Sequence, residues 1–188
     1  SANVESTTSK TVYVEDVAMV KSASTGTFSA DGIVTYSLKV RVSEYVSASS
    51  IVVTDVSPNG LCPLSSTSNF ATGSPADCAA VAGSDPTGAS FASVTQNPDG
   101  TFTSVFTPIA VAPDGTATIT YRARMRSTYT GGALAGQPTV AGDSFTNNAS
   151  LTATTTPVPA TGQGGSTQTV GDTSSATLST DGLSIDKK

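Results

Sequence analysis

The sequence contains no histidine and no tryptophan, and only 12% of its 188 residues are charged. Without histidine the chain cannot build a Ser-His-Asp or Cys-His catalytic centre. Its two cysteines are too few for an ordinary zinc site. The net charge of −5 argues against a general nucleic-acid-binding protein. We therefore expect a protein that is not an enzyme in the usual sense, with no metal, no cofactor and no nucleic-acid partner.

Apolar residues make up 37% of the chain, which is sufficient for a hydrophobic core. With so few charges, solubility depends on Thr, Ser, Asn and Gly, a composition that suits strand surfaces of extracellular repeat proteins. The sequence shows no signal peptide and no run of about 18 apolar residues. We expect an excised segment of a longer, secreted protein, without membrane insertion.

Short stretches of alternating apolar and polar residues recur along the chain, and no window shows a sustained helical period. Turn sequences such as SPNG at 57, NPDG at 97 and PDG at 113 separate them. This pattern predicts an all-β, antiparallel sandwich. Residues 91–106 (FASVTQNPDGTFTSVF) are typical of a hairpin with Pro98, Asp99 and Gly100 in its turn.

The domain organisation is predicted from composition and from a similarity between the two ends. The Thr/Pro/Gly/Ser-rich composition of residues 154–175 predicts a flexible loop. Residues 8–22 resemble residues 174–188, which indicates a tandem array, although any two β-strands share some likeness. The predicted units are a linker or last strand of a preceding repeat (1–16), a sandwich domain (17–180) and the start of the next repeat (181–188).

The cysteines, Cys62 and Cys78, bracket a Ser/Thr/Ala-rich stretch. A disulfide closing this loop would stabilise the fold by roughly 3 kcal/mol and requires an oxidising compartment. The alternative is a pair of small, unpaired, apolar side chains.

Three polar residues lie on the apolar side of their strands: Lys21 in VAMVKSA, Asp55 in SIVVTDV and Asn147 in FTNNASLTA. Burial lowers the proton affinity of a lysine and raises that of an aspartate. A proton could then pass from Lys21 to Asp55, leaving a neutral amine beside an acid that hydrogen-bonds the carboxamide oxygen. Attack on the Cγ of Asn147 and loss of ammonia would leave a Lys–Asn isopeptide bond.

Each of these residues also has an ordinary structural explanation. Lys21 could extend its ammonium to the edge of the sandwich. Asp55 could cap the following SPNG turn, and Asn147 could satisfy backbone groups at a strand end. Two substitutes also remain open, Asn148 as the acceptor if a bulge shifts the register and Glu15 as the acid.

The segments VAMVKSAS, GIVTYSLKV, VVTDVSPNGL and FTNNASL occur in this order between residues 17 and 153. Together they resemble the isopeptide-forming, immunoglobulin-like (Cna-type) repeat domains of Gram-positive surface adhesins and pilins. The resemblance implies an immunoglobulin-like β-sandwich, here with an inserted loop and hairpin region at about 62–107. It also implies a Lys21–Asn147 crosslink assisted by Asp55, and an extracellular location in a cell-wall-anchored surface protein. The family usually has Leu where this chain has Ser57, which weakens packing at that turn.

Five basic residues are expected to face outward on two strands, namely Lys39, Arg41, Arg122, Arg124 and Arg126. Such a basic face could bind an anionic glycan or a neighbouring domain, or it could be a solvated surface.

Taken together, the sequence features suggest two functions. The first is a structural stalk module whose partners are neighbouring repeats of the same chain. The second is a ligand-binding adhesin domain that recognises a host protein or glycan.

Overall fold

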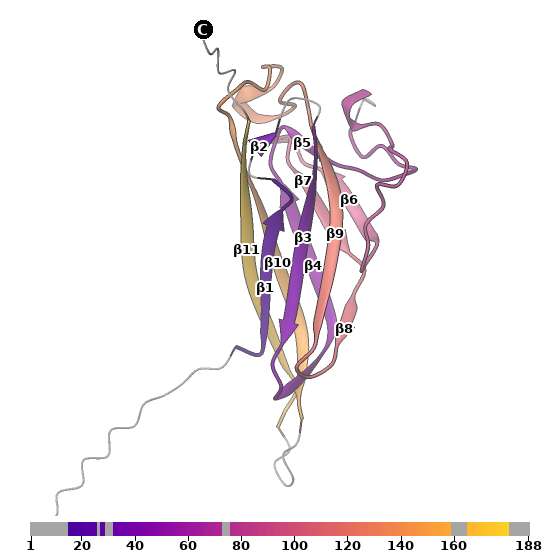
Figure 1. Ribbon diagram of the computed structural model, residues 1–188, viewed down its shortest axis with the longest axis vertical. Helices are drawn as coiled ribbons and strands as arrows, with labels where there is room; N and C mark the ends of the chain where they lie inside the picture. Colours follow the sequence, from indigo (N-terminus) through magenta and orange to yellow (C-terminus); the bar gives the residue numbers. More distant parts are fainter. Residues whose placement is uncertain (1–14, 26, 29–31, 73–75, 159–164, 181–188) are drawn as a thin grey trace, which may run out of the picture.

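A computed structural model describes residues 15–25, 27–28, 32–72, 76–158 and 165–180. Its strands form two sheets that pack face to face and run along the long axis of the molecule (Figure 1). The smaller sheet has the order β1-β3-β9-β5. Its strands are β1 (Val17–Ala23), β3 (Ile33–Val42), β9 (Thr116–Met125) and β5 (Leu61–Pro63).

The larger sheet has the order β2-β11-β10-β4-β7-β6, and β8 also pairs with β4. All its pairings are antiparallel except the short one between β2 and β11. Its strands are β2 (Thr27–Phe28), β4 (Val46–Ser57), β6 (Phe91–Gln96), β7 (Phe102–Phe106), β8 (Ile109–Val111), β10 (Ser144–Pro157) and β11 (Gln168–Thr180).

The core lies between the two sheets and follows from the alternation of residues along the strands. In β3 every second side chain is buried: Val34, Tyr36, Leu38, Val40 and Val42. Strands β4, β9 and β10 contribute inward residues in the same way. Because successive side chains of a strand point to opposite faces, this alternation creates one apolar face per sheet. The predicted all-β, antiparallel sandwich is confirmed.

The predicted hairpin at 91–106 is also confirmed, since β6 and β7 pair antiparallel. Its turn is closed by a hydrogen bond from the Gly100 amide to the Asn97 carbonyl at 2.9 Å. Gly100 has a φ of +86°, and a Cβ there would lie 2.7 Å from the Gly131 nitrogen, so only glycine fits. The hairpin continues the larger sheet beyond β4. Within the predicted insertion, the main part outside both sheets is therefore the segment between β5 and β6.

The prediction of a loop at 154–175 is wrong for most of the residues that the structure describes there, although Val158 and residues 165–167 lie outside the strands. Strand β10 extends to Pro157, β11 begins at Gln168, and Thr154 pairs with Thr169. Ala153 and Thr155 are buried, so the inward alternation of β10 continues through the Thr-rich stretch. Threonine is β-branched and favours strands, and this preference outweighs the loop-like composition.

The described strands run from Val17 to Thr180. Residues 1–14 and 181–188, on which the predicted linker and next repeat largely depend, lie outside the described residues. Within the described ranges, no helix is long and apolar enough to cross a membrane.

Candidate functional site

The three inward polar residues predicted from the sequence meet between the two sheets. Lys21 comes from β1 in the smaller sheet, whereas Asp55 and Asn147 come from β4 and β10, which are neighbours in the larger sheet. All three are buried, with 5%, 0% and 0% of their surfaces exposed, respectively. The Lys21 Nζ contacts Asp55 Oδ2 as an ion pair. The strand parity of the sequence therefore places these residues on the correct face.

Tyr121 of β9 completes this cluster, and sequence analysis missed it. Its hydroxyl donates a hydrogen bond to Asp55 Oδ1 at 2.6 Å. The hydroxyl oxygen of Tyr121 also accepts a hydrogen bond from Asn147 Nδ2, likewise at 2.6 Å. Tyr121 thus connects the carboxylate to the carboxamide. The alternation of β9 shows that Tyr121 points inward, but an inward tyrosine is usually an ordinary core residue.

Aromatic rings form one wall of the cluster. Tyr36 and Tyr121 stack with their ring centroids 5.3 Å apart. The Lys21 Nζ lies 4.8 Å from the Tyr36 ring centroid and 5.6 Å from that of Tyr121. The Tyr36 hydroxyl is buried and makes no hydrogen bond of ordinary geometry within the described residues. The rings therefore exclude water from the lysine while supplying a weakly favourable π-face for its charge.

Burial changes the protonation of both members of the ion pair. It lowers the pKa of the Lys21 ammonium, an effect that Asp55 opposes. It raises the pKa of the Asp55 carboxyl, against the opposing effects of Lys21, Tyr121 and Asn147. The two shifts bring the proton affinities of the amine and the carboxylate toward each other. The site can therefore hold Lys21 as a neutral amine next to a protonated Asp55.

The orientation of the Asn147 carboxamide differs from the sequence-based expectation. We expected the acid to hydrogen-bond the carboxamide oxygen. Instead, the nitrogen faces the cluster, and the buried Asn147 Oδ1 has no hydrogen-bond partner among the described residues. Because the nitrogen is the leaving group in amide formation, this orientation suits protonation of the departing ammonia.

Ser57 also contacts the acid. Its hydroxyl lies 3.5 Å from Asp55 Oδ1 and is fully buried. The departure from the family pattern at this position thus places a weak hydrogen-bond donor, rather than an apolar side chain, beside the carboxylate.

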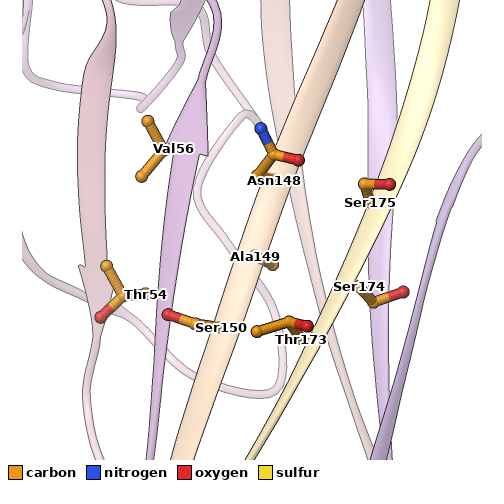
Figure 2. A pocket seen from close by; sticks show the side chains of 8 residues that line it. All are labelled: Thr54, Val56, Asn148, Ala149, Ser150, Thr173, Ser174 and Ser175. Atoms are coloured by element: carbon orange, nitrogen blue, oxygen red, sulfur yellow. The ribbon is translucent and has the colours of Figure 1, made fainter.

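The two substitute residues lie outside the cluster. Asn148 is exposed on the outer face of the larger sheet, where it lines a shallow pocket with residues of β4 and β11 (Figure 2). The bulge that could have turned it inward occurs farther along β10, between Thr152 and Thr154. Glu15 is exposed and precedes the first residue of β1. Neither residue is in position to act on Lys21.

Strand β11 fixes the position of β1 at the open edge of the sandwich. The Met19 amide donates to Asp172 Oδ2 at 2.6 Å, and the Lys21 amide donates to Ser174 Oγ at 2.9 Å. These side chains satisfy backbone groups that no neighbouring strand pairs. They also hold the backbone from which the Lys21 side chain extends into the core.

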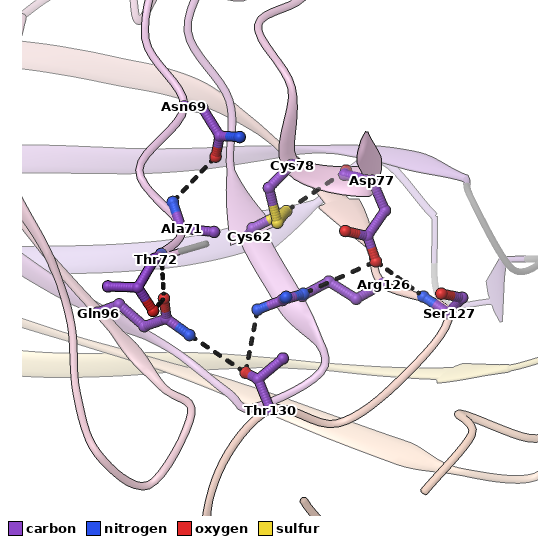
Figure 3. Close-up of a disulfide and its surroundings, with 10 residues drawn as sticks. All are labelled: Cys62, Asn69, Ala71, Thr72, Asp77, Cys78, Gln96, Arg126, Ser127 and Thr130. Atoms are coloured by element: carbon purple, nitrogen blue, oxygen red, sulfur yellow. Dashed lines mark hydrogen bonds and ion pairs between the residues drawn. A yellow bond between two sulfur atoms is a disulfide. The ribbon is translucent and has the colours of Figure 1, made fainter. Parts of the chain in front are cut away.

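A second cluster surrounds the disulfide, which joins Cys62 of β5 to Cys78 of the short 3-10 helix η1 (Ala76–Cys78) (Figure 3). The predicted pairing of the two cysteines is confirmed. Beside the disulfide, the guanidinium of Arg126 lies 3.7 Å from Asp77 and donates a hydrogen bond to Thr130.

The predicted basic face is not a continuous surface. Arg126 is only 3% exposed, because it turns under the segment that the disulfide anchors. Arg122 is half-buried and donates to Ser84 of the same segment at 3.3 Å. Arg124 is also half-buried, whereas Lys39 and Arg41 are exposed. Strand parity could not reveal this difference, because the covering segment has no regular pattern.

Among the described residues, no group of three or more His, Cys, Asp or Glu side chains is arranged to hold a metal ion.

Neither protein-family models nor curated proteins give a match to the chain. Among solved structures, it is similar to Spo0M, a sporulation control protein from Bacillus subtilis, with 6% identity and a TM-score of 0.36. That similarity covers 90% of this chain but only 51% of Spo0M. It is also similar to BslA, a bacterial hydrophobin, with 10% identity, a TM-score of 0.39 and coverage of 92% and 100%, respectively. Neither likeness is close enough to transfer a function.

Proposed function

We propose that this chain is a structural module of a bacterial surface fibre or adhesin, stabilised by an autocatalytic isopeptide bond between Lys21 and Asn147. The observation that supports it is the buried contact of the Lys21 amine with the Asp55 carboxylate, which Tyr121 connects to Asn147. A stabilising role alone explains this cluster poorly. Replacing a buried ion pair by apolar side chains is often neutral or stabilising.

The proposed reaction uses only groups of the chain. Lys21 passes a proton to Asp55, and the neutral Nζ attacks the Cγ of Asn147. The new C–N bond forms with the lone pair of Nζ, and the bond from Cγ to Nδ2 breaks with its electron pair on nitrogen. Nζ loses two protons in total. One of them completes the departing ammonia. The other remains on Asp55 or is taken up by the ammonia, which then leaves as ammonium.

The position of the bond suits a load-bearing module. It joins β1 of one sheet to β10 of the other, and β10 is the last strand but one. Tension applied at the two ends of the domain would reach the bond before it could extend the chain between residues 21 and 147. The disulfide supports an oxidising, extracellular location for the same module.

Intact mass of the purified protein tests this proposal. Under reducing conditions, the protein should weigh less than its sequence by one ammonia, and peptide mapping should find Lys21 joined to Asn147. The Asn147→Ala variant is the matched control, because it keeps the ion pair but removes the acceptor. Full sequence mass of the folded wild-type protein, with separate Lys21 and Asn147 peptides, would refute the crosslink.

A ligand-binding adhesin domain is the second candidate. It is favoured by a small pocket on the disulfide-anchored segment, lined by Ser65, Ser68, Phe70, Asp85, Pro86, Ser90 and Phe91. The pocket combines two aromatic residues, Phe70 and Phe91, with serine hydroxyls and the Asp85 carboxylate, so it offers both apolar and hydrogen-bonding groups to a ligand. A glycan array with the wild-type protein and the Phe70→Ala variant tests this function. Binding that the variant loses would support it, and an array without binding would contradict it.

A further inference from the structure

The hydroxyl of Tyr121 contacts two groups, one of which must lose a proton and the other gain one in the proposed reaction. Asp55 must release a proton after taking one from Lys21, and the Nδ2 of Asn147 must gain one to leave as ammonia. The Tyr121 oxygen lies 2.6 Å from Asp55 Oδ1 and 2.6 Å from Asn147 Nδ2. Both separations are in the range across which hydroxyl groups exchange protons along hydrogen bonds.

The two oxygens of Asp55 face different partners. Oδ2 contacts Lys21 Nζ, whereas Oδ1 accepts the hydrogen bond of Tyr121. A carboxyl group can therefore receive a proton at one oxygen and release one from the other. Lys21, Asp55, Tyr121 and Asn147 thus form one continuous chain of hydrogen-bonding contacts from the attacking nitrogen to the departing nitrogen.

From this chain of contacts we infer that Tyr121 is a catalytic proton relay in isopeptide formation, an inference that rests on the proposed function. After Lys21 has been neutralised, the carboxyl group of Asp55 carries that first proton on Oδ1, the oxygen next to Tyr121. As the bond from Cγ to Nδ2 breaks, Tyr121 gives its proton to Nδ2 and takes the proton from Asp55 Oδ1, while Oδ2 accepts the second proton of Nζ. The hydroxyl is therefore unchanged at the end, and of the two protons that Nζ loses, one has completed the departing ammonia and the other remains on Asp55.

The environment of Tyr121 is consistent with a proton relay whose hydroxyl does not persist as a phenolate. The residue is 1% exposed. Burial, together with the charge of Asp55, raises the pKa of its hydroxyl well above the usual value. A lasting phenolate is thus disfavoured, so a proton that leaves the oxygen must be replaced as it leaves. No other hydroxyl among the described residues is hydrogen-bonded to both Asp55 and Asn147.

Tyr36 provides a matched control, because its ring stacks on that of Tyr121 and both residues are buried. Its hydroxyl lies near Asn147, which interacts with it electrostatically, but the hydroxyl makes no hydrogen bond of ordinary geometry among the described residues. Tyr36→Phe and Tyr121→Phe therefore remove the same atom from the same aromatic pair. Only the second substitution interrupts the proposed path.

The experiment measures the rate of ammonia loss. Wild-type, Tyr36→Phe, Tyr121→Phe and Asn147→Ala chains are synthesised without cells, translation is stopped, and intact mass is followed over time. Circular dichroism establishes that each variant has folded. The relay predicts that Tyr121→Phe slows ammonia loss by about a hundredfold, the contribution typical of general acid–base catalysis, whereas Tyr36→Phe stays near the wild-type rate.

A rate for folded Tyr121→Phe close to the wild-type rate would overturn the relay, and so would equal slowing in both Tyr→Phe variants. These results differ from failure of the proposed function, in which the wild-type chain itself keeps its full mass. If Tyr121→Phe does not fold, 3-fluorotyrosine at position 121 replaces it as the test, because it keeps the hydroxyl and lowers its pKa. The relay then requires a changed rate, and an unchanged rate overturns it.

Discussion

The amine of Lys21 in β1 contacts the carboxylate of Asp55 in β4 across the interior of the sandwich, and neither side chain is exposed to solvent. Removing two charges from water costs several kcal/mol for each ion, which their attraction offsets only in part. In this fold the desolvation cost arises at a contact between the two sheets, where apolar side chains could have packed instead. A chemical role for the pair gives this cost a physical reason.

Substitution of Asp55 should prevent the crosslink without preventing folding. In the Asp55→Ala variant the amine of Lys21 has no acceptor for its proton, so intact mass should show no loss of ammonia. Loss of a crosslink that closes the chain between residues 21 and 147 should lower stability by about 4 to 5 kcal/mol through loop-closure entropy, and leaving the buried Lys21 without its partner should lower it further. Thermal unfolding followed by circular dichroism measures this loss.

Asn147→Ala and Glu15→Ala are the controls for the role of Asp55. Asn147→Ala should lose the crosslink as Asp55→Ala does, while it retains the ion pair. Glu15→Ala should crosslink like the wild-type protein, because Glu15 is exposed and lies outside the cluster. Crosslinking in Asp55→Ala but not in Glu15→Ala would show that Asp55 is not the acid.

Removal of the disulfide should affect a different part of the protein. In the Cys62→Ala/Cys78→Ala variant, the segment between β5 and β6 loses its covalent anchor. The loss is about 3 kcal/mol if this segment unfolds together with the domain. Limited proteolysis should then cleave within residues 64–90 first. Lys21, Asp55 and Asn147 lie on other strands, so ammonia loss should proceed as in the wild-type protein, and its absence would mean that the two clusters depend on each other.

The edge contacts between β11 and β1 should matter for the position of Lys21. Asp172→Ala removes the acceptor of the Met19 amide and should cost about 1 to 3 kcal/mol, because a partly buried donor loses its partner. Asp172→Asn keeps an oxygen acceptor and should cost less. Chemical denaturation of both variants in an Asn147→Ala background measures the effect without the crosslink. Equal stability of Asn147→Ala alone and of Asn147→Ala combined with either Asp172 substitution would show that the edge contact contributes nothing.

The sequence contains enough information for the positions of Lys21, Asp55 and Asn147, because a period of two in a strand fixes which face each side chain occupies. It does not contain the same information for Tyr121. An inward tyrosine between Ile119 and Ala123 satisfies the ordinary apolar pattern, and only the three-dimensional contacts show what its hydroxyl binds.

Two expectations from the sequence fail for different reasons, one because composition outweighed the local pattern and the other because strand parity does not describe what covers a strand. The Thr-rich residues after Ala153 were predicted to form a loop, yet they continue the inward alternation of β10. Arg126 was predicted to face solvent, yet a segment with no regular pattern covers it and supplies Asp77 as its partner. Coverage by irregular segments depends on long-range contacts that strand parity does not describe.

The hydroxyl of Tyr129 donates a hydrogen bond to Asp143 Oδ2 at 2.8 Å, and this contact should make the stability of the protein depend on pH in the alkaline range. Burial, together with this hydrogen bond and the charge of Asp143, raises the pKa of Tyr129 from 10.0 to about 12. Between these values, the folded protein holds a proton that the unfolded chain has lost. Stability from this group is therefore complete below the lower value and falls as the pH rises toward the higher one.

The Tyr129→Phe variant should be less sensitive to pH in this window. Denaturation with urea at about pH 9 and about pH 11 should show a smaller decrease in the free energy of unfolding for the variant than for the wild-type protein. Tyr36 and Tyr121 have raised pKa values as well, so both proteins should lose stability, and the difference between them isolates Tyr129. Asp143→Asn should reduce the sensitivity in part, because it removes the neighbouring charge but keeps a hydrogen-bond acceptor. Identical pH dependence in wild-type and Tyr129→Phe proteins would contradict the prediction, since the contact with Asp143 would then not distinguish the folded from the unfolded state.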